Sequence, residues 1–82
     1  MKVPRDLSGK QLARLLLAFG YSPTRQTGSH MTLTTSQLGE HHITVPIHKV
    51  LPIGTTLAIL REVGRHFDLD REAVAKRLFE RP

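Results

Sequence analysis

Two stretches of alternating polar and apolar residues constrain the fold of this chain more than any other feature. Residues 30–35 alternate between polar side chains and the apolar Met31 and Leu33, and residues 42–45 alternate in the same way. Successive side chains of a strand point to opposite faces, so each stretch predicts a strand with one apolar face. The turn-forming residues 36–40 join them into a hairpin. Helices must cover the apolar face, whereas the other face, with its histidines and threonines, can stay in water.

A helix is predicted before the hairpin. Ser8 and Gln11 have the spacing of a capping box, which marks the start of a helix. Four apolar residues then recur on one helical face: Leu12, Leu15, Leu16 and Phe19. Gly20 is suited to end the helix in a left-handed conformation, so we expect a helix over residues 9–19. Residues 21–26 are polar and include Pro23, which has no N–H for a neighbouring strand, and this predicts an edge strand.

Two further helices are predicted after the hairpin. A loop bracketed by Pro46 and Pro52 leads through residues 54–56 into a helix. The stripe of that helix consists of Leu57, Leu60, Gly64 and Phe67, where Gly64 marks either close packing or the helix end. Asp70 can cap a third helix that reaches Phe79. The predicted fold is therefore α+β: a three-stranded antiparallel sheet with helices on one face, as in double-stranded RNA-binding domains.

Composition narrows the class of protein. The 82 residues predict one domain over residues 1–82, and the absence of cysteine excludes disulfides and thiolate metal sites. No apolar run has the roughly 20 residues of a membrane helix, so we expect a cytoplasmic protein with no membrane partner. The net charge of +5 fits a polyanionic partner, and equally an unselective basic surface.

His30 is the candidate catalytic residue. It follows Gly28 and Ser29, and an imidazole on an open sheet face can exchange protons near neutral pH. Gly28 permits close backbone approach, although it could simply form a tight turn. RNA supplies its own nucleophile, the 2′-hydroxyl, so one histidine with basic neighbours could cleave it. Arg25 and Lys49 are the nearest cations in sequence for a phosphate, unless they are merely solvated.

Other chemistries fit these residues less well. His41 and His42 are adjacent in a strand and must point to opposite faces, so they cannot share a metal ion. His30 and His42 could meet across the hairpin and recruit His48, but no carboxylate or cysteine nearby would complete the ligand set. We therefore expect no metal and no cofactor. A nucleophilic Ser29 activated by His30 is disfavoured because neighbours in a strand diverge.

Taken together, residues 28–30, the hairpin, residues 45–48 and residues 54–60 resemble the HicA-type mRNA interferase toxins of toxin-antitoxin systems. The resemblance spans roughly residues 8–64. It implies a double-stranded-RNA-binding-like fold, metal-independent endoribonuclease activity on mRNA, and a HicB-like antitoxin as partner. The family's active-site histidine falls on His30, and a second recurring histidine falls on His48, with a structural or substrate-positioning role. The chain departs from shorter members in its C-terminal helix.

Three classes of function remain at this point: a nuclease toxin, a noncatalytic RNA-binding module and a basic adaptor for a protein partner. The lysines are dispersed along the chain, which disfavours a pure double-stranded RNA binder. An adaptor would not need an open face with histidines. The toxin is therefore the favoured interpretation, with His30 as catalytic residue and an RNA-binding set comprising Arg25, Gly28, Ser29, His48 and Lys49.

Overall fold

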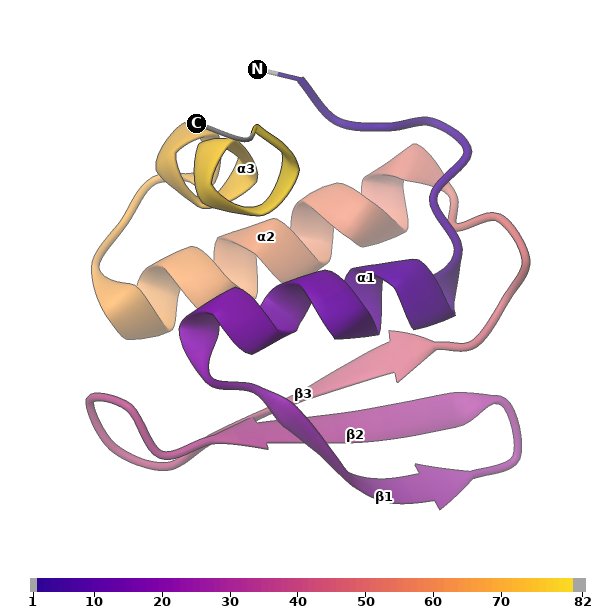
Figure 1. The fold of residues 1–82 in the computed structure, drawn as a ribbon, viewed down its shortest axis with the longest axis horizontal. Coiled ribbons are helices and arrows are strands. Elements are labelled where there is room, and N and C mark those ends of the chain that lie inside the picture. Colours follow the sequence, from indigo (N-terminus) through magenta and orange to yellow (C-terminus); the bar gives the residue numbers. More distant parts are fainter. Residues whose placement is uncertain (1, 81–82) are drawn as a thin grey trace.

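The structure, a computed structural model, describes residues 2–80 and has the predicted α+β architecture. Its elements are α1 (Gly9–Leu15), the 3-10 helix η1 (Leu16–Phe19), β1 (Ser22–Thr27), β2 (His30–Thr35), β3 (His41–Pro46), α2 (Ile53–Phe67) and α3 (Arg71–Phe79). All helices lie on the same side of the sheet, and the other face of the sheet is bare (Figure 1). The prediction of an antiparallel sheet covered on one face is confirmed.

The sheet is antiparallel with the order β1-β2-β3, so β1 is an edge strand as predicted. It begins one residue later than expected, at Ser22, because Tyr21 is not part of the polar strand. Tyr21 is completely buried, which corrects its assignment to the polar edge. The register of β1 against β2 shifts between Pro23 and Arg25, where a bulge absorbs the extra residue Thr24.

The first helix begins and ends as its sequence predicts. Ser8 Oγ accepts from the backbone N–H of Gln11 at 3.0 Å, and Gln11 Oε1 accepts from the N–H of Ser8 at 2.8 Å, completing the capping box. The last turn tightens into η1, and Gly20 ends it with a φ of 81°. The side chain of Thr35 is fully enclosed on the covered face, where its hydroxyl donates to the Phe19 carbonyl at 2.9 Å.

Helix α2 begins at Ile53 and buries a stripe that differs in part from the predicted one. Ile59 and Val63 are buried beside Leu60, whereas Leu57 and Phe67 are only partly buried. Gly64 lies inside the helix rather than at its end. A Cβ there would collide with the carbonyl oxygen of Leu69, so this glycine allows the chain to turn back closely along α2.

Helix α3 belongs to the same core as the rest of the molecule. Asp70 Oδ1 accepts from the N–H of Ala73 at 2.8 Å, which confirms the predicted cap. The apolar side of the helix, formed by Val74, Ala75 and Leu78, is buried in the common cluster. Arg77 adds a second link to η1, because its guanidinium donates to the Ala18 carbonyl at 3.0 Å and lies 4.6 Å from the centre of the Phe19 ring.

Candidate functional site

The imidazole of His30 lies exposed at one end of the bare sheet face. His30 is the first residue of β2 and stands opposite Thr27 on one side and Pro46 on the other. The hydrogen bonds of this face join Thr24, Thr34, His42 and Glu40, and the His30 ring takes part in none of them. Both of its ring nitrogens are therefore open to a ligand within the described residues 2–80.

The turn before His30 is shaped by Gly28. Its φ of 57° lies in the left-handed region, where L side chains are strained, so the turn favours glycine here. A Cβ at this position would meet no atom within 4 Å, which leaves free space beside the turn. Ser29 anchors the turn to the chain after β3, because its carbonyl accepts from the N–H of Ile47 at 2.6 Å.

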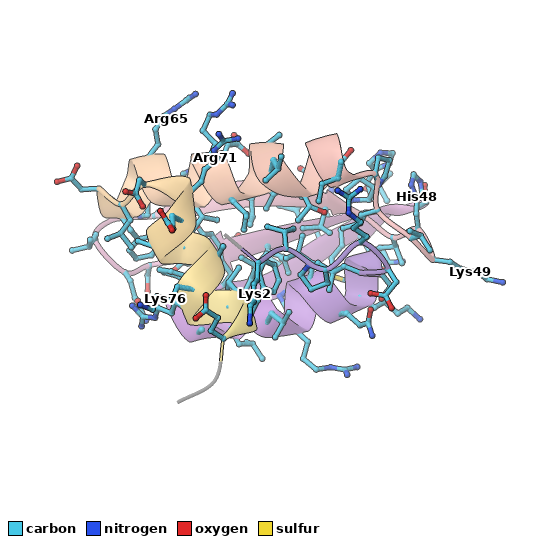
Figure 2. The ribbon with its side chains drawn as sticks, turned by 90° about the horizontal axis from the view of Figure 1, so that it is seen from above. Lys2, His48, Lys49, Arg65, Arg71 and Lys76 are labelled. Carbon is cyan, nitrogen blue, oxygen red and sulfur yellow. The ribbon has the colours of Figure 1, made fainter. Side chains whose placement is uncertain are left out.

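His48 and Lys49 come to the same end of the molecule through the segment that leaves β3. The carbonyl of His48 accepts from the N–H of Gly9, the first residue of α1, at 2.9 Å. Both side chains are exposed, and Figure 2 shows them together at one end of the molecule. Sequence reasoning missed Gly9, although a Cβ there would collide with the Pro46 carbonyl oxygen. Glycine at this position lets α1 sit directly against the end of β3.

Arg25 shares the bare face with His30. It pairs with Thr32 across the sheet, and residues that stand opposite each other share a face. Because Thr27 pairs with His30 itself, Arg25 lies two residue pairs further along the sheet, on the same face. The predicted site residues thus lie in two neighbouring parts of the molecule, the bare sheet face and the segment after β3. Arg25 and His30 are on the bare face, and His48 and Lys49 follow the end of β3.

The other end of the bare face carries a hydrogen-bonded chain of four side chains. Glu40 Oε2 lies 2.8 Å from His42 Nε2, His42 Nδ1 lies 2.7 Å from Thr34 Oγ1, and Thr34 Oγ1 lies 2.8 Å from Thr24 Oγ1. The chain therefore spans all three strands. Sequence reasoning missed it. The signal that could have found it is the Glu-X-His spacing at the start of β3, which places both side chains on the same face.

The structure corrects the idea that His30 and His42 meet across the hairpin. His42 stands opposite Thr34, four residue pairs away from His30, because the hairpin turn fixes the register of the two strands. A carboxylate does lie beside His42, contrary to the sequence expectation, and it belongs to Glu40. Residues 2–80 contain no group of three potential metal-ligating side chains.

The remaining two histidines lie on the helix side of the sheet, where they serve packing. His41 and His66 stack with their ring centres 4.5 Å apart, and His41 Nδ1 lies 2.8 Å from the Tyr21 hydroxyl. His66 Nε2 donates to the Gln37 carbonyl at 2.8 Å. Burial, and then the neighbouring His66, lower the pKa of His41, while burial and then Glu62 raise the pKa of Tyr21 to about 12. His41 contacts Tyr21 and His66 on the helix side, whereas His42 contacts Thr34 on the bare face, which confirms that these neighbours point to opposite faces.

None of the helices within residues 2–80 combines the length and the apolar character needed to cross a membrane.

Comparison with known proteins places these features in a family. Residues 9–64, more than half of the chain, match the family described as "HicA toxin of bacterial toxin-antitoxin". No curated protein and no solved structure gives a significant match. The matched region begins at Gly9, the first residue of α1, and ends at Gly64 inside α2, so it contains the whole sheet and His30. The chain therefore belongs to the HicA toxin family of toxin-antitoxin systems.

Proposed function

We propose that this protein is a metal-independent endoribonuclease that cleaves mRNA in the cytoplasm and so inhibits translation, with His30 as its proton-transfer group. The observation that carries the proposal is the exposed His30 ring, which makes no hydrogen bond within the described residues, in a chain of the HicA toxin family. An exposed imidazole with no hydrogen bond can approach a substrate with either ring nitrogen.

The reaction needs no nucleophile from the protein. Neutral His30 accepts the proton of the ribose 2′-hydroxyl while the 2′-oxygen attacks the adjacent phosphorus. The bond from phosphorus to the 5′-oxygen breaks, and this oxygen leaves with a proton from the imidazolium or from water. The products are a 2′,3′-cyclic phosphate on one fragment and a 5′-hydroxyl on the other.

Positive charge near His30 supports phosphate binding. Arg25 is exposed on the same face, and a guanidinium can hold two phosphate oxygens at once. His48 and Lys49 lie at the end of β3, whose first following residue is tied to the turn before His30. We propose that Arg25 and Lys49 contact the phosphates next to the cleaved linkage, and that the Gly28–Ser29 turn and His48 contact the same strand.

The products and the substrate's 2′ group test this proposal. We expect the purified protein to cut single-stranded RNA in EDTA, and to leave intact an RNA with a 2′-methoxy group at the cleaved linkage. Mass spectrometry should find cyclic phosphate ends. Cleavage of DNA at a comparable rate, or 5′-phosphate ends, would instead indicate attack by water. RNA binding without any cleavage would favour a noncatalytic RNA-binding module.

Membership of the family implies an antitoxin partner, and we propose that this partner is HicB-like, acidic, and covers His30. A groove of about 300 Å³ supports an acidic partner, because its apolar floor is flanked by two cations. It is lined by Lys10, Ala13, Arg14, Leu17, Pro23 and Met31. Met31 follows His30 in β2, but its side chain points to the covered face. A partner segment in this groove therefore lies on the helix side of β2 and has to continue around the β1 edge of the sheet to cover His30.

Substitution of an exposed leucine tests the groove. Leu17→Glu would place a negative charge among the side chains that face the acidic partner, so we expect slower association and weaker binding. Leu38→Glu, at the exposed hairpin turn, is the matched control and should bind like the wild type. Equal binding by both variants would contradict the groove as the interface. A tight complex that still cuts RNA at the free toxin's rate would contradict the covering of His30.

A further inference from the structure

The chain of hydrogen bonds from Glu40 to Thr24 marks a second place on the bare face where RNA could be held. His42 and His30 are on the same face, and four residue pairs separate their positions along β2. At about 3.3 Å per residue this is about 13 Å, too far for both rings to act on one phosphate. In an RNA lying along this face, His42 therefore contacts a nucleotide that is separate from the cleaved linkage.

Both nitrogens of the His42 ring are already engaged. Nε2 donates to the carboxylate of Glu40, and Nδ1 is bonded to the Thr34 hydroxyl. Yet 54% of the side chain is exposed. The ring can still offer its flat face to a ligand, because unstacked RNA bases stack on aromatic side chains, including histidine. An exposed contact between a histidine and a carboxylate adds little to stability, so the main consequence of these bonds is a fixed ring orientation.

The carboxylate of Glu40 determines which part of RNA fits beside the ring. It is 73% exposed, and when ionised it only accepts hydrogen bonds. A phosphate would be repelled, whereas base N–H groups could donate to its free oxygen. Guanine presents two adjacent N–H donors on its Watson–Crick edge. Uracil presents one donor between two carbonyl oxygens, which the carboxylate disfavours.

We propose that His42 and Glu40 form a nucleobase subsite that selects guanine at a position away from the cleaved linkage. The base stacks on the His42 ring and donates to Glu40, while Thr34 holds the ring in place. This inference rests on the proposed ribonuclease function for its substrate, but it concerns binding and adds no chemical step. It divides the bare face into a phosphate-binding end at His30 and a base-reading end at His42.

Binding of an uncleavable RNA tests the subsite without relying on catalysis. The probe is a short 2′-methoxy oligouridine, compared with the same strand carrying one guanosine, and its affinity is read by fluorescence anisotropy. We expect the guanosine to tighten binding by about tenfold. Glu40→Gln should remove this advantage, and His42→Ala should weaken binding of both probes by about tenfold through lost stacking. His42→Phe should restore stacking.

Two further variants separate a binding role from a structural one. Thr34→Val removes the bond that orients the ring and should reduce the guanosine advantage, whereas Thr34→Ser should retain it. Thr44→Val is the matched control, since Thr44 lies on the same face outside the hydrogen-bonded chain. It should behave like the wild type.

The outcomes of this test are separable from those of the cleavage test. Equal affinity for the two probes, or a Glu40→Gln variant that keeps the guanosine advantage, would overturn the subsite even if the wild type cuts RNA. Loss of antitoxin binding in His42→Ala, with RNA binding unchanged, would assign the pair to the protein interface and also overturn it. Guanosine-dependent binding by a protein that cuts no RNA would support the subsite and overturn the proposed reaction.

Discussion

The two faces of the sheet use histidine in opposite ways. On the covered face, His41 is stacked on His66 and bonded to Tyr21, and burial lowers its pKa. On the bare face, the ring of His30 takes part in none of the hydrogen bonds that link the neighbouring side chains. The open nitrogens of His30 can exchange protons with a substrate, whereas the stacked and hydrogen-bonded ring of His41 supports the fold. The two histidines therefore differ in role because the His41 ring is hydrogen-bonded and stacked, whereas the His30 ring is open to a ligand.

The largest expected effect of this difference is on catalysis. His30→Ala should lower the rate of RNA cleavage by at least about a hundredfold, because general acid–base catalysis contributes at least that much. An exposed residue contributes little to packing, so its free energy of unfolding should change by no more than about 0.5 kcal/mol. Initial rates in EDTA and thermal melting measure the two quantities.

Lys76→Ala is a suitable control for His30→Ala. Lys76 is exposed on α3, and the substitution removes one charge far from the site in sequence. Its rate of RNA cleavage should lie within about twofold of the wild-type rate, since a substitution on the surface away from the site has a small effect. A His30→Ala variant that cuts at the wild-type rate would break the comparison, because the open ring would then have no catalytic use.

The second effect concerns the backbone that supports the His30 end. Gly9→Ala should destabilise the protein by about 2 kcal/mol, because its Cβ would collide with the Pro46 carbonyl and force α1 away from β3. Gly54→Ala is the matched control. Its Cβ meets nothing within 4 Å, so it should stabilise the helix by up to about 1 kcal/mol. Chemical denaturation measures both, and equal stabilities would contradict the close approach at Gly9.

Much of the fold could be predicted from local patterns. Alternation over residues 30–35 and 42–45 assigns the two faces of the hairpin, and the caps at Ser8 and Asp70 mark real helix starts. These features depend on neighbours within a few positions in sequence. The burial of Tyr21 could not be predicted in this way, because the side chains around it include Phe67 of α2, which is distant in sequence.

The candidate site was predictable only in part, because register depends on the whole hairpin. His30 could be placed on the open face from alternation alone. The pairing of His42 with Thr34 rather than near His30 follows from the length of the turn, which local pattern leaves open. The close approach at Gly64 had a local signal in the glycine within the apolar stripe, whereas the contact of Gly9 with Pro46 joins segments distant in sequence and has none.

A smaller effect is expected on the covered face. Tyr21→Phe removes the hydroxyl that bonds His41 Nδ1 and leaves that nitrogen without its partner in a partly buried place. We expect a loss of about 1 kcal/mol in the free energy of unfolding, with RNA cleavage retained. Denaturation and cleavage assays on the same preparation measure both. Loss of cleavage with normal stability would mean that the covered face also takes part in the reaction, which would break the comparison.

The smallest expected effect is a dependence of stability on pH that comes from His41 on the covered face. The pKa of His41 is lowered in the folded protein, first by burial and then by His66, so the unfolded chain binds a proton at a higher pH than the folded chain. This contribution to stability is therefore complete above the unfolded pKa of about 6.5 and declines as the pH falls towards the folded value. Denaturation midpoints measured from neutral to mildly acidic pH should show the decline, and His41→Gln should make it shallower. An unchanged slope in His41→Gln would contradict this assignment to the covered face.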